Sequence, residues 1–163
     1  MGKTPYPLEQ LTLIKKRRLE EAERLLKQKK ELLAIEEKKL KDLEGDRDKV
    51  KYHKEAKLAQ LRLELDTSGS TTTTILQMKS YLKEVDEKLK IRELKLREQQ
   101  KQVDLATKAV DIARQDMLKK GQSVEKMRLH KDEWLKQQKI YEEQLDALET
   151  EELGTMMFSR KKR

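Results

Sequence analysis

The sequence has no cysteine and very few residues that interrupt a helix. Without cysteine it can form neither a disulfide framework nor a thiolate zinc site. Its two prolines, Pro5 and Pro7, both lie near the N-terminus, and there are five glycines in 163 residues. Because so little breaks the backbone, neither a β-rich fold nor one with many loops is expected.

Large apolar residues are also scarce. There is one Phe and one Trp, and hydrophobic residues make up 35% of the chain, whereas Asp, Glu, Lys and Arg make up 43%. This composition cannot fill the core of a globular domain of this length. The apolar residues are therefore either scattered, as in disordered chains, or spaced with a helical period, as in long helices that pack along a narrow seam.

Long hydrophobic runs are missing too. No stretch approaches the roughly 18 apolar residues of a membrane-spanning helix, and the start of the chain has no signal-peptide core. The opening Met1-Gly2-Lys3 is similar to a myristoylation signal, but Tyr6 stands where that signal has Ser or Thr. The sequence predicts a soluble, cytoplasmic protein without direct membrane insertion.

The formal net charge is +8, which raises the possibility of a nucleic-acid or anionic membrane partner. However, 31 acidic residues are interspersed among 39 basic ones, so no continuous phosphate-binding face is predicted. The two basic runs, residues 15–18 and 160–163, are interpreted as solvated cationic segments rather than specific nucleic-acid contacts.

One small, polar segment, residues 66–74, separates two stretches of helical character, because its Asp, Ser, Gly and Thr residues favour turns. Thr74 and Gln77 have the spacing of a capping box at the start of a helix. The predicted organisation is an N-terminal extension (1–6), a first helix (7–65) that begins with Pro7 in its first turn, a hairpin loop (66–74), a second helix (75–152) and a basic C-terminal tail (153–163).

The second helix carries a seven-residue apolar repeat. Alternating steps of three and four from Ile75 reach Met78, Leu82 and, much later, Leu148. Such a repeat keeps one seam facing a partner helix and predicts left-handed supercoiling. The positions that are not apolar are Arg92, Gln99, Lys120, Lys131, Gln138 and Glu152.

The first helix is patterned differently, with apolar residues spaced eighteen apart, which is five turns of a straight helix. Apolar residues with this spacing line up in one straight stripe, which predicts that the two helices pair more loosely and with less supercoiling. Long charged side chains along it would lead their charges out to water. The apolar sets are Ile14, Leu32 and Val50, then Ala22, Leu40 and Leu58, then Leu25, Leu43 and Leu61, and the charged positions are Arg18, Lys29, Glu36, Arg47 and Lys54.

The predicted fold is all-α, a long antiparallel two-helix coiled-coil hairpin. The short loop gives the second helix an effective concentration on the order of millimolar, so pairing within a monomer should outcompete pairing between chains. Equal pairing from the loop sets His53 opposite about residue 87. Neither His53 nor His130 then has a metal-binding neighbour, and both are predicted to be solvated.

The second helix is longer than the first, so its C-terminal part should extend beyond the paired region. Trp134, Tyr141, Leu145 and Leu148 continue the seam there and are predicted to have no partner in the same chain. Either they cover a folded-back N-terminus or stay exposed, or they insert into another protein, as exposed apolar stripes often do.

The sequence offers no catalytic chemistry. It has no glycine-rich phosphate loop and no nucleophile elbow, and its carboxylates lie on exposed helix faces where nothing desolvates them to tune a pKa. A pair of helices also has no concave pocket. We therefore expect a binding protein rather than an enzyme, with no cofactor and no metal.

Several segments, in their order and spacing, resemble the type III secretion stalk proteins of the FliJ/YscO class, and most closely the chlamydial form. The resemblance covers roughly residues 6–135 and depends on the combination around the loop rather than on any single motif. The segments are Tyr6-Pro7-Leu8-Glu9, Ile14-Lys15-Lys16, Ala22-Glu23, Arg47-Asp48-Lys49-Val50-Lys51, His53, Gln60-Leu61-Arg62, Leu65-Asp66, Ile75, Met78-Lys79, Tyr81, Arg128-Leu129-His130-Lys131 and Glu133-Trp134.

This resemblance implies three partners: a hexameric type III secretion ATPase, the cytosolic ring of the export gate, and secretion chaperones. It implies that the end with both termini enters the ATPase, at a site of Leu8, Leu11, Trp134, Tyr141, Leu145 and Leu148. The residues near the turn, Arg47, Lys51, Lys54, Met78 and Tyr81, would contact the gate. The protein would then lie at the secretion apparatus, peripheral to the inner membrane.

Two other functions stay open from the residues alone. The chain could be a structural coiled-coil spacer or tether unrelated to an ATPase, in which case a parallel dimer or a higher oligomer is expected. It could also be a nucleic-acid-binding helix pair that uses the basic tail, with binding that falls steeply with salt.

Overall fold

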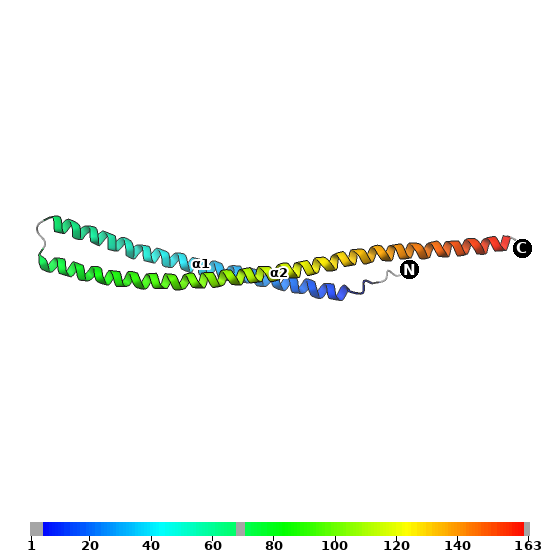
Figure 1. Ribbon diagram of the computed structural model, residues 1–163, viewed down its shortest axis with the longest axis horizontal. Coiled ribbons are helices and arrows are strands. Elements are labelled where there is room, and N and C mark those ends of the chain that lie inside the picture. Colours follow the sequence, from blue (N-terminus) through cyan, green and yellow to red (C-terminus); the bar gives the residue numbers. More distant parts are fainter. Residues whose placement is uncertain (1–4, 68–70, 162–163) are drawn as a thin grey trace. The chain divides into compact units, whose positions relative to one another are not determined.

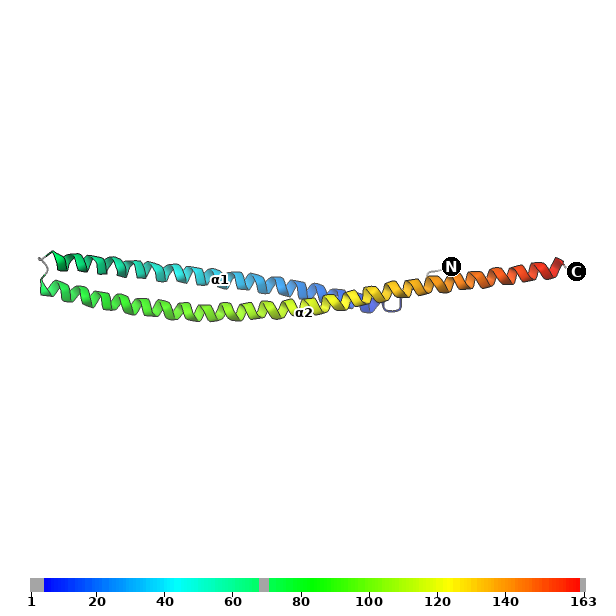
Figure 2. The same cartoon turned by 45° about the horizontal axis from the view of Figure 1, so that its top comes forward.

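The computed structural model of the protein describes residues 5–67 and 71–161. Two helices, α1 (Glu9–Asp66) and α2 (Thr72–Lys161), contain almost all of them, and the described residues include no strand. On either side of the loop the two helices run in opposite directions (Figures 1 and 2). The predicted all-α helical hairpin is confirmed.

Helix α1 begins two residues later than predicted, at Glu9 rather than Pro7. Pro7 and Leu8 form a turn in which the amide of Glu9 donates to the carbonyl of Tyr6 at 3.2 Å. Pro7 keeps Tyr6 out of the helix, because a proline disfavours helical backbone in the residue before it.

The predicted capping box at Thr74 is wrong. Helix α2 already begins at Thr72, and Thr71 precedes its first turn. The carbonyl of Thr71 accepts from the amides of Thr74 and Ile75 at 3.0 and 3.2 Å, and its hydroxyl bonds that of Thr74 at 2.7 Å. Any of several consecutive threonines can serve as the residue that caps the start of a helix, and here Thr71 does so. Part of the predicted loop, residues 68–70, lies outside the described residues.

Helix α2 also continues to Lys161, well past the predicted end at Glu152. The segment expected to be a basic tail is therefore helical through Lys161. A single glycine, Gly154, costs a helix only about 1 kcal/mol relative to alanine. Arg160 and Lys161 lie in the last turn, where cations interact favourably with the helix dipole.

The seven-residue seam of α2 is where the sequence places it. Every position of the repeat from Ile75 to Gln138 is buried or half-buried, including the polar ones. Val85 and Ala113 are the most buried members, with 3% and 6% of their surface exposed. From Tyr141 onward the same positions are exposed.

The eighteen-residue stripe predicted for α1 is confirmed only in part, because six of its nine apolar residues are buried or half-buried and three are exposed. Ile14, Leu25 and Leu32 are 47%, 43% and 52% exposed, whereas Ala22 and Leu26 are buried. The covered positions of α1 instead follow the same steps of three and four as those of α2, because a helix must match the repeat of the helix it packs on. The covered positions that follow these steps are Thr12, Lys15, Leu19, Ala22, Leu26, Lys29, Leu33, Glu36, Leu40, Leu43, Arg47, Val50, Lys54, Lys57, Leu61 and Glu64, and Leu58 beside them is half-buried too.

The molecule divides into two compact units. The first, called here the loop unit, is Leu25–Arg114. The second, the terminal unit, consists of the described residues of Met1–Arg24 and Gln115–Arg163. Neither described helix contains a stretch apolar and long enough to cross a membrane.

Polar contacts between the helices fix their register in the loop unit. The side-chain amide of Gln99 donates to the Glu36 carboxylate at 2.6 Å and to the Glu36 carbonyl at 3.1 Å. The ammonium group of Lys54 is 2.5 Å from a carboxylate oxygen of Asp86, which is the pairing that equal extension from the loop predicts. Glu36 and Lys54, two polar seam residues of α1, thus have polar partners on α2.

Candidate partner-binding surfaces

In the terminal unit, residues that precede α1 pack on α2 through Tyr6. Only 7% of the surface of Tyr6 is exposed. Its ring meets that of Trp134 edge-on, with centroids 5.4 Å apart, and its hydroxyl is 2.6 Å from Nδ1 of His130. Trp134, half-buried, therefore has a partner in its own chain, and the prediction that it lacks one is wrong. The folded-back N-terminus accounts for this residue.

Charged groups hold the same contact together. Lys131 lies 5.7 Å above the Tyr6 ring, and its ammonium group is 2.6 Å from the carboxylate of Glu9 in the first turn of α1. Six residues further along α1, the ammonium group of Lys15 donates to the hydroxyl of Ser123 at 2.7 Å. These contacts hold the beginning of α1 against α2, and Trp134 is the last apolar seam position that is at least half-buried.

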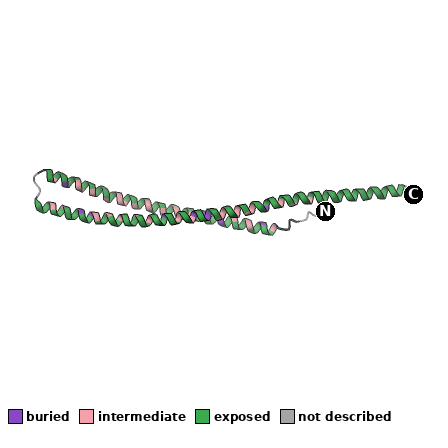
Figure 3. Ribbon diagram, in the orientation of Figure 1, coloured by how far each residue is buried: buried purple, intermediate pink, exposed green. Residues whose placement is uncertain are grey.

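Three seam residues that follow Trp134 are exposed. Tyr141, Leu145 and Leu148, called here the apolar stripe, have 57%, 41% and 57% of their surface exposed. All residues from 139 to 161 are exposed, and Figure 3 shows this part of α2 uniformly in the colour of exposed residues. The stripe therefore continues the packing seam without any described residue packed over it.

Leu8 and Leu11 of the same predicted site are also exposed, at 36% and 41%. The carbonyl of Leu8 accepts from the backbone amide and the hydroxyl of Thr12, both at 3.0 Å, which ties Leu8 to the first turn of α1. The structure therefore brings Leu8 and Leu11 to the start of α1, near the Tyr6 contact. They are not part of the stripe on α2.

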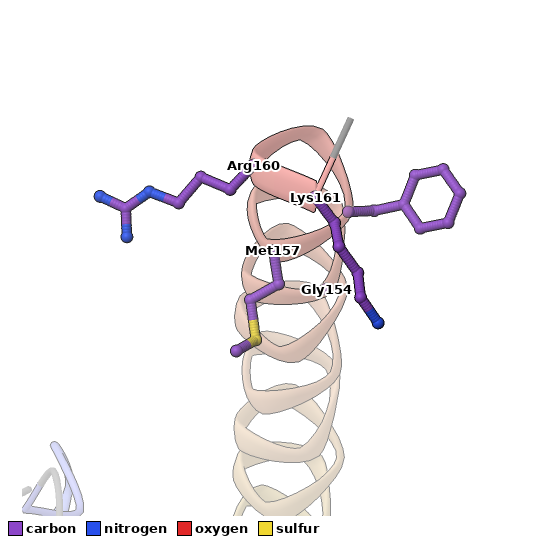
Figure 4. Close-up of a pocket in the computed structure, with 5 residues that line it drawn as sticks. Gly154, Met157, Arg160 and Lys161 are labelled. Carbon is purple, nitrogen blue, oxygen red and sulfur yellow. The ribbon is translucent and has the colours of Figure 1, made fainter. Parts of the chain in front are cut away.

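The last turns of α2 add apolar surface that sequence reasoning missed. Leu153, Met156 and Met157 are 61%, 63% and 75% exposed. Figure 4 shows Met157, Arg160 and Lys161 pointing outward from this helix, so the hollow that they line with Gly154 and Phe158 belongs to one helix end. The helical spacing of Leu153, Met156 and Met157 was the available signal, and the assignment of a tail after Glu152 hid it.

A cluster of ion pairs reinforces α2 just before Trp134. The guanidinium group of Arg128 bonds the carboxylate of Glu125 at 2.6 Å and that of Asp132 at 3.2 Å. The hydrogen bond from Arg128 lowers the pKa of Glu125, and the same bond raises the pKa of Arg128. All three side chains are on one helix face at spacings of three and four, where such pairs support local helix.

Near the turn, the predicted gate residues do not form one exposed surface. Arg47, Lys54 and Met78 are half-buried in the seam, and the first two are ion-paired, Arg47 with Asp48 at 2.8 Å. Lys51 and Tyr81 are exposed. Lys51 lines a shallow hollow with Asp48, Tyr52 and Glu55.

Two aromatic features of the loop unit were not predicted. His53 is exposed as expected, but its Nε2 is 2.7 Å from the hydroxyl of Tyr81, and the rings meet edge-on at 5.9 Å. Tyr52, with 73% of its surface exposed, lies outside the seam. The sequence signal for Tyr52 was an aromatic residue at a position outside the apolar repeat. Among the described residues, no group of His, Asp and Glu side chains could hold a metal ion.

Comparisons with known proteins agree with this architecture. Residues 3–163 match the family model described as YscO-like protein. A solved structure described as that of a proposed YscO homolog from Chlamydia trachomatis is 39% identical, has a TM-score of 0.91, and covers 98% of each chain. No curated protein matched the sequence.

Proposed function

The chain belongs to the YscO-like family and is a type III secretion stalk protein, and from this premise we propose that it binds the hexameric secretion ATPase and links it to the export gate. It would also bind secretion chaperones. It would act without catalysis of its own, at the cytoplasmic side of the inner membrane. The match over nearly the whole chain favours this function over that of an unrelated coiled-coil spacer.

The observation that supports ATPase binding is the exposed apolar stripe. Tyr141, Leu145 and Leu148 occupy the positions that pack against α1 earlier in the helix, but here they face solvent. An amphipathic helix of this kind binds by laying its apolar face into a groove. Leu8, Leu11 and Trp134, at the Tyr6 contact, would lie at the edge of that interface.

The structure of the segment also suits a six-fold ring. One helix, or a pair of helices, has no six-fold symmetry, so identical ring subunits must meet different faces of it. Only some subunits could contact the apolar stripe at a given moment. The stalk would therefore bind subunits unequally, which can bias the ring toward one sequence of states.

For the gate contact, the exposure of the side chains supports a narrower surface than the sequence predicted. We place it around Lys51 and Tyr81, with Tyr52 added because it is so exposed. Arg47, Lys54 and Met78 would position this surface through the seam rather than touch the gate. Exposed Tyr residues are common anchors at protein interfaces.

Binding of the purified ATPase and its hexamer formation and turnover test the proposal. The variant Leu145→Ala/Leu148→Ala should weaken binding at least about tenfold, since well-packed interface anchors contribute 1 kcal/mol or more each. Leu94→Ala/Ile112→Ala is the matched control, because those residues are 63% and 69% exposed on the same helix. Absence of any ATPase binding or effect by the wild-type chain would contradict the proposal.

A further inference from the structure

The segment that bears the apolar stripe has the opposite charge to the rest of the chain. Residues 140–159 contain no Lys or Arg, although the chain as a whole has a formal net charge of +8. All of the charged residues in this segment are acidic. They are Glu142, Glu143, Asp146, Glu149, Glu151 and Glu152.

Several of these carboxylates border the stripe. At 100° per residue, Glu142 and Glu149 each follow a stripe residue, Tyr141 and Leu148, and so lie along one edge of it. Glu151 lies along the other edge, and Glu152 continues the line of the stripe itself. The exposed surface is therefore an apolar strip with acidic margins.

The negative charge is mostly uncompensated. Among the described residues, Glu143 is the only one of the six whose carboxylate has a cation nearby, the ammonium group of Lys139 at 3.8 Å. Glu143 lies on the side of the helix away from the stripe. The carboxylates along the margins are thus available to interact with a partner's cations.

This pattern disfavours a second copy of the chain as the occupant. Antiparallel pairing of two stripes would set Glu142 and Glu149 of one copy against Glu149 and Glu142 of the other, because residues that flank an antiparallel seam face their equivalents. Parallel pairing would set Glu152 against Glu152. Either arrangement places like charges side by side in a seam of only three apolar residues.

We propose that the stripe docks in a groove with an apolar floor and Lys- or Arg-lined rims on the secretion ATPase. The groove would receive Tyr141, Leu145 and Leu148, and its rims would face Glu142, Glu149 and Glu151. The identity of the partner rests on the proposed function, whereas the chemistry of the groove follows from the charge pattern. Charged rims of this kind steer encounter and orient the helix more than they add affinity.

The test measures binding of the purified ATPase to two variants with equal charge changes. Glu142→Lys/Glu149→Lys reverses charge beside the stripe, and Glu143→Lys/Asp146→Lys reverses it on other faces of the same turns. The first should weaken binding about tenfold and flatten its salt dependence, since exposed charge interactions are individually modest and screened by salt. The second should change binding less than about twofold. Circular dichroism checks that both variants stay helical.

The outcomes separate the two proposals. Equal effects of the two variants, or salt-independent binding that Leu145→Ala/Leu148→Ala still abolishes, would overturn the basic-rimmed groove and leave ATPase binding intact. Wild-type chain that does not bind the ATPase overturns the proposed function. A dimer in sedimentation that Leu145→Ala/Leu148→Ala dissociates would show that the stripe serves a second copy, and that also overturns the inference.

Discussion

At the scale of single residues, Tyr6 is the clearest test of the contact between the start of α1 and α2. Tyr6→Ala should leave Trp134 exposed and loosen the first turns of α1, because it removes a buried ring and a hydrogen bond to His130. We expect a red shift in tryptophan emission and a loss of about 1–3 kcal/mol in local stability, less than for a deep core aromatic. Trp134 is the sole tryptophan, so fluorescence reports this contact directly.

The control is Tyr6→Phe, which keeps the ring and removes only the hydroxyl. It should cost about 1 kcal/mol and shift the emission little. If Tyr6→Ala left the emission of Trp134 unchanged, the ring contact would not exist in solution.

The carboxylate of Glu36 makes the stability of the helix pair depend on pH. Hydrogen bonds from Lys39 and from Gln99 lower the pKa of Glu36 below its ordinary value of 4.5. Since the folded state lowers this pKa, the stability that Glu36 contributes is present above its unfolded pKa and is lost as pH falls through the lowered folded value.

Glu36→Gln should therefore reduce stability near neutral pH, and the difference from wild type should shrink as the pH is lowered from 6 toward 3. Urea unfolding followed by circular dichroism at several pH values measures it. Glu37→Gln, at an exposed neighbouring position, is the control. A difference that stayed constant over this range would contradict the role of the Glu36 carboxylate.

At the scale of the elements, α1 shows what sequence patterns can and cannot decide. The apolar repeat of α2 is nearly continuous, so its seam could be assigned residue by residue. In α1 many seam positions are polar, among them Lys15, Lys29 and Glu36, so the apolar residues alone gave a period that matches only part of the seam. The covered face of α1 follows the seven-residue repeat of α2, and the sequence of α1 taken alone does not contain that repeat.

Adjacent leucines in α1 distinguish the two periods. Leu26 is 8% exposed and belongs to the seven-residue seam, whereas Leu25 is 43% exposed and belongs to the eighteen-residue stripe. Leu26→Ala should cost about 2–3 kcal/mol, the lower part of the range for buried leucines, and Leu25→Ala less than about 1 kcal/mol. Denaturant unfolding of both variants measures the difference, and equal costs would contradict the seam described for α1.

At the scale of the whole molecule, the sequence predicted the helical hairpin and the seam of α2, because few residues break the helices and one stripe is long. It left a folded-back N-terminus open as one alternative but did not identify Tyr6 as the residue that makes the contact, because Tyr6 lies in a short non-helical segment between two prolines. Nor did it predict α2 beyond Glu152, since residues 153–163 were assigned to a basic tail. The exposed stripe was predicted, but Trp134 was wrongly included among its unpartnered residues.

The central claim is that α2 is covered by its own chain up to Trp134 and offers the following segment to the ATPase. Amide hydrogen exchange along α2, with and without the ATPase hexamer, tests it most directly. We predict slow exchange from residue 78 to 134 in both samples, and fast exchange from residue 141 to 157 that slows when the ATPase is added. Uniform exchange along α2 in the free chain, or no change at residues 141–157 with a saturating amount of ATPase, would contradict the account.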